Sequence, residues 1–363
     1  MEENLILCAA ADGGKSLPDS EDFAFLRDLG LIKTDGEIEK LTVAGLLFVG
    51  KQSSISRLLP SAEVIYLHYS ADNLEEYDAR LDMRQPIVSV LDRLTEIIQN
   101  DNRILNVQIG LFRLEIADFS EKVFQEALLN AMSHRDYQSM SAVYVKHYPD
   151  KIVIENPGGF LDGITEKNII THPSAPRNKL IAETLQHLKY VQRTGQGVDI
   201  ICREMVSMGK PYPEYHVFSD AVSLTLRSSV EDMSFVKFVV AEQEKKQIIL
   251  SLAELMILRY VTENKQIKLS DAKDLVQLSL EDTRKCCLNL VKLGLIETVG
   301  KEYMLTARVY EMVKSDVQYT RDKVVQYIKA EQQARATIDK MRKENIIDMI
   351  GKGKSSKYVL VKS

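Results

Sequence analysis

The chain has 363 residues, a hydrophobic content of 45% and a formal net charge of −5, values that indicate a globular protein of two or three domains. The acidic balance excludes a surface that is basic throughout, as a protein that coats nucleic acid would need. The charge is unevenly spread, however, because residues 321–363 carry 11 Lys and Arg against 5 Asp and Glu, or +6, which leaves −11 for the first 320 residues.

The spacing of the cysteines and the lengths of the apolar runs indicate the cellular compartment of the protein. The four cysteines (Cys8, Cys202, Cys286 and Cys287) have neither the spacing of a disulfide framework nor that of a zinc site. No apolar run approaches the ~18 residues of a membrane span, and residues 5–11 are too few for the apolar core of a signal peptide. We therefore expect a cytoplasmic protein that makes no membrane contact.

The N-terminal third is expected to contain a leader (residues 1–20) and an α/β part (residues 21–115) that packs on the next domain. Residues 41–49 are an apolar run that fits either a buried helix or a buried strand. Residues 62–69 are rich in β-branched and aromatic side chains and predict a strand. Residues 86–100 predict a helix, because apolar side chains recur at helical spacing and a proline stands near the first turn.

Residues 116–230 are expected to form the central domain. A helix that starts after Ser120 is followed by two alternating runs that turn at Pro149-Asp150, a hairpin pattern. A helix over 177–188, a glycine loop that opens another helix, and a closing strand over 217–227 complete the domain. This order predicts an α+β fold, here an α/β sandwich with a mostly antiparallel sheet.

The C-terminal third is expected to be mainly helical. Residues 243–315 predict three helices and a hairpin that turns at Gly300, which is the pattern of a winged helix-turn-helix. Residues 318–363 resemble a second, abbreviated and basic copy, with room for a last helix and a wing.

The helix after Ser120 carries the most informative pair of polar residues. Glu126 and Asn130 stand one turn apart on one face, beside apolar neighbours. An exposed polar pair is the plainer explanation for such spacing alone. Two glycine-bearing segments follow, however, one starting at Asn156 and one over residues 193–197. Together they offer a metal ligand in Asn130, a base for water in Glu126, and backbone donors for phosphates.

These segments resemble a known family. Residues 22–228 are similar to the ATP-binding part of bacterial and archaeal proteins that are described as transcriptional regulators and often grouped with a RecG helicase C-terminus. Their ATPase domain is of the GHKL type, named after gyrase, histidine kinases and MutL. The resemblance is carried by Glu126-Ala-Leu-Leu-Asn130-Ala-Met-Ser-His134-Arg135-Asp136-Tyr137, Ile154-Glu-Asn-Pro-Gly158, Pro176-Arg177-Asn178, Arg193-Thr194-Gly195-Gln-Gly197 and the upstream residues 41–48.

The resemblance implies a role for several residues. Asn130 would hold Mg²⁺ and Glu126 would be the companion glutamate of the same motif. Asn156 and Gly158 stand where the family reads adenine, and Gly195 and Gly197 stand for the glycines of the phosphate lid. The remaining residues implied to contact the cofactor are His134, Arg135, Arg193 and Thr194.

Two departures from the family pattern favour nucleotide binding over efficient hydrolysis. Asn156 replaces the usual aspartate; its oxygen can accept from an amino group, but the negative charge is gone. The glycine lid is also minimal. In addition, the family usually begins with an AlbA-like, Schlafen-related domain, for which residues 1–20 are too few.

Some motifs have simpler explanations. His134 and Arg135 lie at the end of a helix, where cations complement the helix dipole, so a packing role is an alternative. Residues 13–16 and 352–355 contain Gly-Lys-Ser, but Ala9 and Asp348 stand where a P-loop needs its first glycine. The chain therefore contains no P-loop motor.

Basic residues of the C-terminal third are the candidates for DNA contacts. On the third helix of the first winged unit they mix with acidic side chains, so a contact within the chain or in a homodimer is the alternative there. In the tail they suit phosphates and not base identity. The candidates are Arg284, Lys285, Arg335, Lys340, Lys352 and Lys354.

The sequence thus predicts an ATP-binding, Mg²⁺-dependent transcriptional regulator that binds DNA through winged-helix units. One alternative is a slow ATPase of DNA repair or defence, with Glu126 as general base. Another is a nucleotide-free scaffold that uses its winged helices for protein contacts. The sequence does not name the DNA target, and it leaves open whether ATP is hydrolysed and whether the protein is a dimer.

Overall fold

The computed structural model describes residues 20–35, 38–71, 76–109, 112–173, 175–190, 197–313, 347–350 and 357–360. The chain divides into two compact units, Met1–Met304 and Leu305–Ser363. The expected leader lies almost entirely outside the described residues. No helix in the described part of the chain combines the length and apolar character that a membrane span requires.

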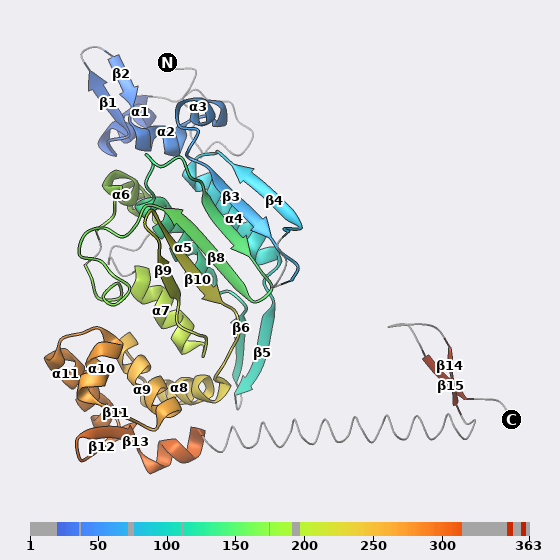
Figure 1. Cartoon of the computed structure of the whole chain (residues 1–363), viewed down its shortest axis with the longest axis vertical. Coiled ribbons are helices and arrows are strands. Elements are labelled where there is room, and N and C mark those ends of the chain that lie inside the picture. Colours follow the sequence, from blue (N-terminus) through green and yellow to red (C-terminus); the bar gives the residue numbers. More distant parts are fainter. Residues whose placement is uncertain are drawn as a thin grey trace. The chain divides into compact units, whose positions relative to one another are not determined.

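A six-stranded sheet forms the centre of the first unit (Figure 1). It is mixed, because β3 and β7 run parallel whereas the other neighbours pair antiparallel. In spatial order its strands are β4 (Ala79–Met83), β3 (Val64–His68), β7 (Val143–His147), β8 (Lys151–Pro157), β10 (Ala221–Arg227) and β9 (Glu214–Val217).

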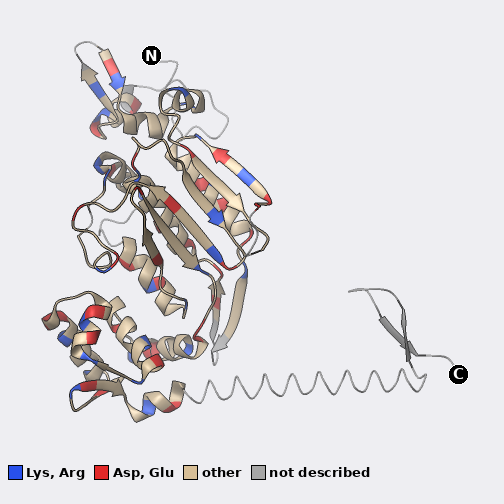
Figure 2. Ribbon diagram, viewed as in Figure 1, with Lys and Arg blue, Asp and Glu red and all other residues tan. Residues whose placement is uncertain are grey.

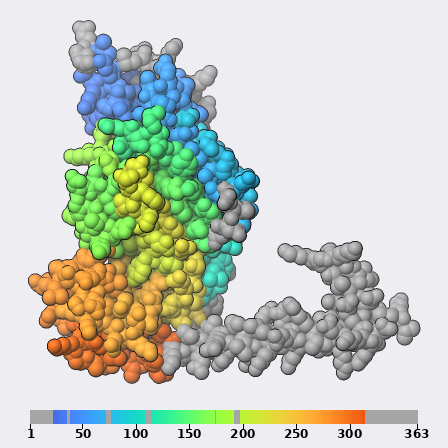
Figure 3. Space-filling model, viewed as in Figure 1, coloured from blue at the N-terminus to red at the C-terminus, as the bar shows by residue number. Residues whose placement is uncertain are grey.

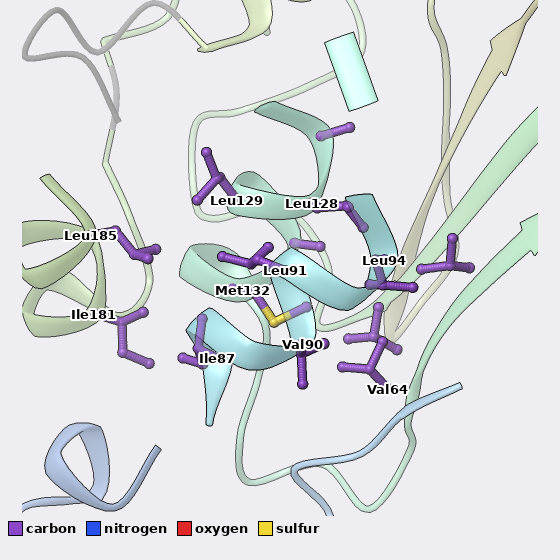
Figure 4. Close-up of a cluster of buried hydrophobic side chains, with 14 of the residues drawn as sticks. Val64, Ile87, Val90, Leu91, Leu94, Leu128, Leu129, Met132, Ile181 and Leu185 are labelled. Carbon is purple, nitrogen blue, oxygen red and sulfur yellow. The ribbon is translucent and has the colours of Figure 1, made fainter. Parts of the chain in front are cut away.

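Helices pack on the sheet and among themselves to form the main hydrophobic core (Figure 4). The buried faces of α4 and α5 meet there, with Leu94 and Leu128 fully buried. The helices of this part are α1 (Ser20–Asp28), α2 (Val43–Val49), α3 (Gln52–Leu58), α4 (Ile87–Asn100), α5 (Glu121–His134), α6 (Lys179–His187) and α7 (Gly197–Ser207).

A smaller apolar cluster uses the other face of the sheet. Because side chains alternate along a strand, Val64 and Tyr66 of β3 join the main core while Ile65 and Leu67 join this second cluster. Burial on both faces explains why β3 is almost continuously apolar.

Two hairpins lie outside the main sheet, and the sequence analysis did not predict them or strand β4. The hairpins pair β1 (Ile32–Asp35) with β2 (Ile38–Leu41) and β5 (Ile104–Ile109) with β6 (Phe112–Ala117). Strands β1 and β2 have only four residues each, too few for a clear alternation. Strand β6 reads Phe-Arg-Leu-Glu-Ile-Ala, which does alternate, so its signal was present in the sequence and was overlooked.

The remainder of the first unit is mainly helical. A three-stranded sheet in the order β11–β13–β12 accompanies the last three helices. Residues 252–305 are called the helical module below. The elements are α8 (Met233–Lys246), α9 (Leu252–Asn264), β11 (Gln266–Lys268), α10 (Leu269–Val276), α11 (Leu280–Lys292), β12 (Ile296–Val299) and β13 (Glu302–Leu305).

Local signals explain where several elements begin. Residues 43–49 are a helix and not a strand, because Thr42 caps them by accepting a hydrogen bond from the Gly45 backbone at 3.0 Å. Helix α9 starts at Leu252, since Ser251 and Glu254 form a capping box. Helix α11 starts after Ser279, whose side chain accepts from the Asp282 backbone.

One strand prediction was wrong in detail. Residues 217–227 were expected to form a single closing strand, but the chain turns between β9 and β10, where the Phe218 backbone donates to the Ala221 carbonyl at 2.8 Å. The α+β class is confirmed. The domain boundaries given above remain predictions. In the second unit, β14 (Ile347–Ile350) pairs antiparallel with β15 (Lys357–Leu360).

Candidate functional site

Helix α5 places Glu126 and Asn130 against the first residue of α7. The apolar face of α5, which includes Phe124, Ala127 and Leu128, is buried in the core and so fixes the rotation of the helix. A Cβ atom added at Gly197 would lie 2.2 Å from Glu126 Oε1 and 2.9 Å from Asn130 Nδ2. A side chain at this position would require Glu126 and Asn130 to move, so glycine lets the backbone of α7 begin this close to the two polar side chains.

One atom in each of two carboxamides at this site is buried without a hydrogen-bond partner among the described residues. Neither Asn130 Nδ2 nor Asn156 Oδ1 makes a hydrogen bond with any described residue. Asn156, at the end of β8, is only 8% exposed. A buried polar atom that lacks a partner costs roughly 1–3 kcal/mol, and such atoms are rare in folded proteins. Because Asn130 and Asn156 also line one cavity, they mark a place where a polar ligand would be bound.

The cavity has a volume of about 150 Å³. Its apolar walls come from α5, from β8 and β10, and from the loop that follows β8. A few polar groups interrupt these walls, which is the usual composition of a small-molecule site. The polar and charged side chains are those of Asn130, His134, Asn156, His172, Arg177 and Asp199.

A glycine turn closes the cavity at the end of β8. Gly158 has φ +99°, a conformation that favours glycine, and its backbone N–H donates to the Asp220 carbonyl at 2.7 Å. Arg177 holds this turn against α5, because its guanidinium donates to the Gly159 carbonyl at 2.7 Å and to the His134 carbonyl at 3.1 Å. The turn is therefore tied both to the sheet and to the end of the helix that carries Asn130.

Burial shifts the pKa values of two titratable side chains, Glu126 and His134. It raises the pKa of Glu126 above its ordinary value. Burial lowers the pKa of His134, and the nearby charge of Arg177 lowers it further, so His134 is neutral at physiological pH. A neutral imidazole can donate one hydrogen bond and accept another. His134 lines the cavity, so its position is compatible with the cofactor contact that the sequence predicted.

Arg135 was predicted to contact the cofactor, and its position corrects that prediction. The side chain is 1% exposed, and its guanidinium donates to the carbonyl oxygens of Glu63, Ser61 and Ser141. It does not line the cavity. Arg135 thus ties the end of α5 to the segment before β3 and to the start of β7, which is the packing alternative stated above.

Some of the remaining predicted site residues line the cavity, and others lie outside the described residues. Gly158 and Gly197 line the cavity with Asn130 and Asn156. Arg193, Thr194 and Gly195 lie outside the described residues, as do Arg335, Lys340, Lys352 and Lys354.

Arg284 and Lys285 are exposed on α11. The Lys285 ammonium lies 3.1 Å from the Glu281 carboxylate and 3.0 Å from that of Asp282, so acidic neighbours already offset its charge.

Sequence reasoning missed three contributors to the cavity. Arg177 was noted only as part of a motif, although its two carbonyl contacts hold the glycine turn. Asp199, in the first turn of α7, and Tyr215, on β9, carried no signal, because neither belongs to a recognisable motif. The cavity position of Tyr215 depends on the β9–β10 pairing, which the sequence did not reveal.

Comparison with known proteins supports a likeness in this region. Residues 141–226 match the family described as "Putative ATP-dependent DNA helicase recG C-terminal", and residues 7–65 match a domain of unknown function, DUF8451. Neither match covers half of the chain. No curated protein matches the sequence significantly.

A solved structure shares the fold. The DIP2311 protein from Corynebacterium diphtheriae is 20% identical, with a TM-score of 0.67 over 81% of this chain and 59% of that one. The present chain thus spans about three-fifths of its relative, and the likeness shows the fold alone. Ligand-free NadR matches 30% of the chain at 14% identity with a TM-score of 0.18, too low to carry an argument.

Replacing Glu126 by Gln should stabilise the protein at neutral pH. Since the folded state raises the pKa of Glu126, it favours the protonated carboxyl, and stability falls as pH rises from the ordinary glutamate pKa through the raised one. A glutamine cannot ionise and avoids this loss. We expect a melting temperature about 2 °C higher than that of the wild type, the shift that somewhat less than 1 kcal/mol produces.

The control is Glu121→Gln, an exposed position on the same helix, which should give no such gain. Below the ordinary glutamate pKa the difference between Glu126→Gln and wild type should vanish. A lower melting temperature for Glu126→Gln at neutral pH would contradict this account of the site.

Proposed function

We propose that the cavity binds ATP together with Mg²⁺ and that residues 116–230 form a GHKL-type nucleotide module. The observation that carries the proposal is a pair of buried amide atoms without a partner, Asn130 Nδ2 and Asn156 Oδ1, on two side chains that line one cavity. The Asn156 oxygen is an acceptor suited to the 6-amino group of adenine. The match of residues 141–226 to the RecG C-terminal family agrees with this assignment.

Asn130 is the residue that would hold the metal ion, through its side-chain oxygen. Mg²⁺ would supply positive charge to the phosphate oxygens. This ion is commonly held by one or two protein ligands together with phosphates and water, so a single ligand suffices. The described residues contain no group of three or more His, Cys, Asp and Glu side chains that would hold a metal without a phosphate.

The start of α7 would receive the phosphates. Gly197 opens an 11-residue helix whose first backbone N–H groups are free of intrahelical partners. Arg193, Thr194 and Gly195 directly precede it in sequence and are the proposed phosphate contacts of the lid.

Slow hydrolysis of ATP is the second candidate activity. Glu126 lies beside Asn130 at the start of α7, and its raised pKa makes it a better base than an exposed glutamate. If the protein hydrolyses ATP, Glu126→Gln should abolish turnover and leave binding intact. A nucleotide-free scaffold remains the third candidate, and the cost of two unpartnered amides argues against it.

We further propose that the protein is a regulator that binds DNA, with residues 243–315 as a winged helix-turn-helix. The order α9, α10, α11 and the strand pair β12–β13 supports this description. Lys and Arg lie among Asp and Glu along the ribbon of these residues (Figure 2). Since Glu281 and Asp282 offset Lys285, the stronger phosphate contacts are assigned to the basic tail after residue 320.

Thermal melting tests nucleotide binding. ATP with Mg²⁺ at 100 times its Kd should stabilise the wild-type protein by about 2.7 kcal/mol and raise its melting temperature by several degrees. Asn130→Ala should lose the part of this shift that depends on Mg²⁺, because it removes the metal ligand. Asn100→Ala, at an exposed position on α4, should shift as the wild type does. A wild-type protein that melts identically with and without ATP would refute the proposal.

DNA binding should depend on the tail more than on α11. Replacing Lys352 and Lys354 together by Glu should weaken binding and lower the slope of log Kd against log salt by roughly 2, since each lost phosphate contact removes about 0.9. Lys285→Ala should change the slope little, because acidic neighbours already engage that ammonium. Fluorescence anisotropy over a salt series measures both. Equal losses in the two variants would contradict the assignment to the tail.

A further inference from the structure

The loop that follows the glycine turn forms one wall of the nucleotide cavity. We call residues 160–173 the cavity loop. Its residues Ile164, Ile169 and Ile170 line the cavity. The loop is internally braced, because the Asn168 side chain accepts from the Thr165 backbone at 2.7 Å and donates to the Gly163 carbonyl at 2.7 Å. Its position as a whole therefore decides the shape of this wall.

One residue of the helical module binds the cavity loop through three hydrogen bonds. Gln277 Oε1 accepts from the Ile170 backbone at 3.2 Å, and the Gln277 carbonyl accepts from Thr171 Oγ1 at 2.8 Å. The Gln277 amide also donates to the Glu166 carbonyl at 3.4 Å. Two of the three bonds use the side chain of Gln277.

The backbone conformation of Gln277 directs its side chain and its carbonyl toward the cavity loop. It is the C-cap of α10 in the left-handed region, with φ +58°, and it follows the buried Val276. Left-handed backbone is unfavourable for a glutamine. It is stabilised here because the turn points the side chain and the carbonyl of one residue at the same loop. Gln277 does not line the nucleotide cavity itself.

The same wall separates two cavities. Ile169, Ile170 and Tyr215 line the nucleotide cavity and also a second cavity of about 300 Å³. On the side of the helical module, the second cavity is lined by Met256, Leu275 and Gln277. Figure 3 shows the green surface of the sheet domain directly against the orange surface of the helical module. The loop is thus backed by a cavity behind Ile169 and Ile170. It is held from two sides: the Glu166 carboxylate accepts from the Val217 backbone of β9 at 3.1 Å, and Gln277 holds the segment at Ile170 and Thr171.

We propose that Gln277 is a positioning residue for the nucleotide cavity: it holds the cavity loop in the conformation that binds nucleotide. This inference rests on the proposed nucleotide-binding function. A loop that is held before binding loses less conformational entropy when the nucleotide arrives, so the affinity is higher. By linkage, bound nucleotide must strengthen the contact between the loop and Gln277 by the same factor. The helical module therefore senses whether the cavity is filled.

The test compares three substitutions by calorimetric titration with ATP and Mg²⁺. Gln277→Asn keeps an amide and tolerates left-handed backbone, but it is one methylene too short to reach the loop. Its Kd should rise roughly 3- to 10-fold, as expected for the loss of two neutral hydrogen bonds that hold the loop. Gln277→Glu keeps the length and the acceptor for the Ile170 N–H and should retain most of the affinity. Gln266→Asn, the same change at an exposed position on β11, should match the wild type.

Hydrogen exchange supplies the readout that a purely structural role would not move. In the wild type, saturating ATP with Mg²⁺ should slow amide exchange in residues 269–277 of the helical module. Gln277→Asn should lose this slowing even when the higher ATP concentration fills its cavity. Equal Kd values for wild type and Gln277→Asn, with equal slowing in both, would overturn the inference and leave the proposed function standing. A wild type that binds no ATP would overturn the proposed function itself.

Discussion

The site depends on the close approach of α7 to α5. The side chains of Glu126 and Asn130 fill the space that a side chain at position 197 would need, so the start of α7 lies directly against two polar groups of α5. Apolar packing on both helices makes this approach possible: Phe124 and Leu128 of α5 and Ile201 of α7 are fully buried. The contact joins three chemical functions within one turn of each helix, namely a carboxylate, a carboxamide and free backbone donors.

Polar groups near this contact divide into those that the fold satisfies and those that it leaves for a ligand. Arg177 and Asn178 belong to the first kind, since both donate to backbone carbonyls at the end of α5. Asn130 and Asn156 belong to the second kind. The distinction follows from position and not from residue type, because Asn178 and Asn156 carry the same side chain. It also explains why a conspicuous cation such as Arg135 serves the fold while the uncharged Asn156 faces the cavity.

Sequence reasoning predicted most of the elements with a clear apolar face and missed several strands outside or at the edge of the main sheet. The helix of Asn130, the hairpin of β7 and β8, and the helices α10 and α11 follow directly from apolar periodicity and capping residues. The strands of the β1–β2 hairpin have four residues each, too few for periodicity to reveal them. Strand β6 alternates apolar and polar residues, and that signal was overlooked. In the cavity, the motif residues Asn130, Asn156 and Gly197 were predicted. Arg177, Asp199 and Tyr215 were not, because only the tertiary fold brings them to the cavity.

The central claim is that the unpartnered oxygen of Asn156 accepts a hydrogen bond from the amino group of adenine. The most direct measurement is the affinity of the wild-type protein for ATP and for purine riboside triphosphate, which differs only by the absence of that amino group. Our account predicts that the analogue, titrated with Mg²⁺ under the same conditions, binds roughly tenfold more weakly or worse, because it leaves a buried acceptor unpaired. Equal affinities for the two nucleotides would contradict the account.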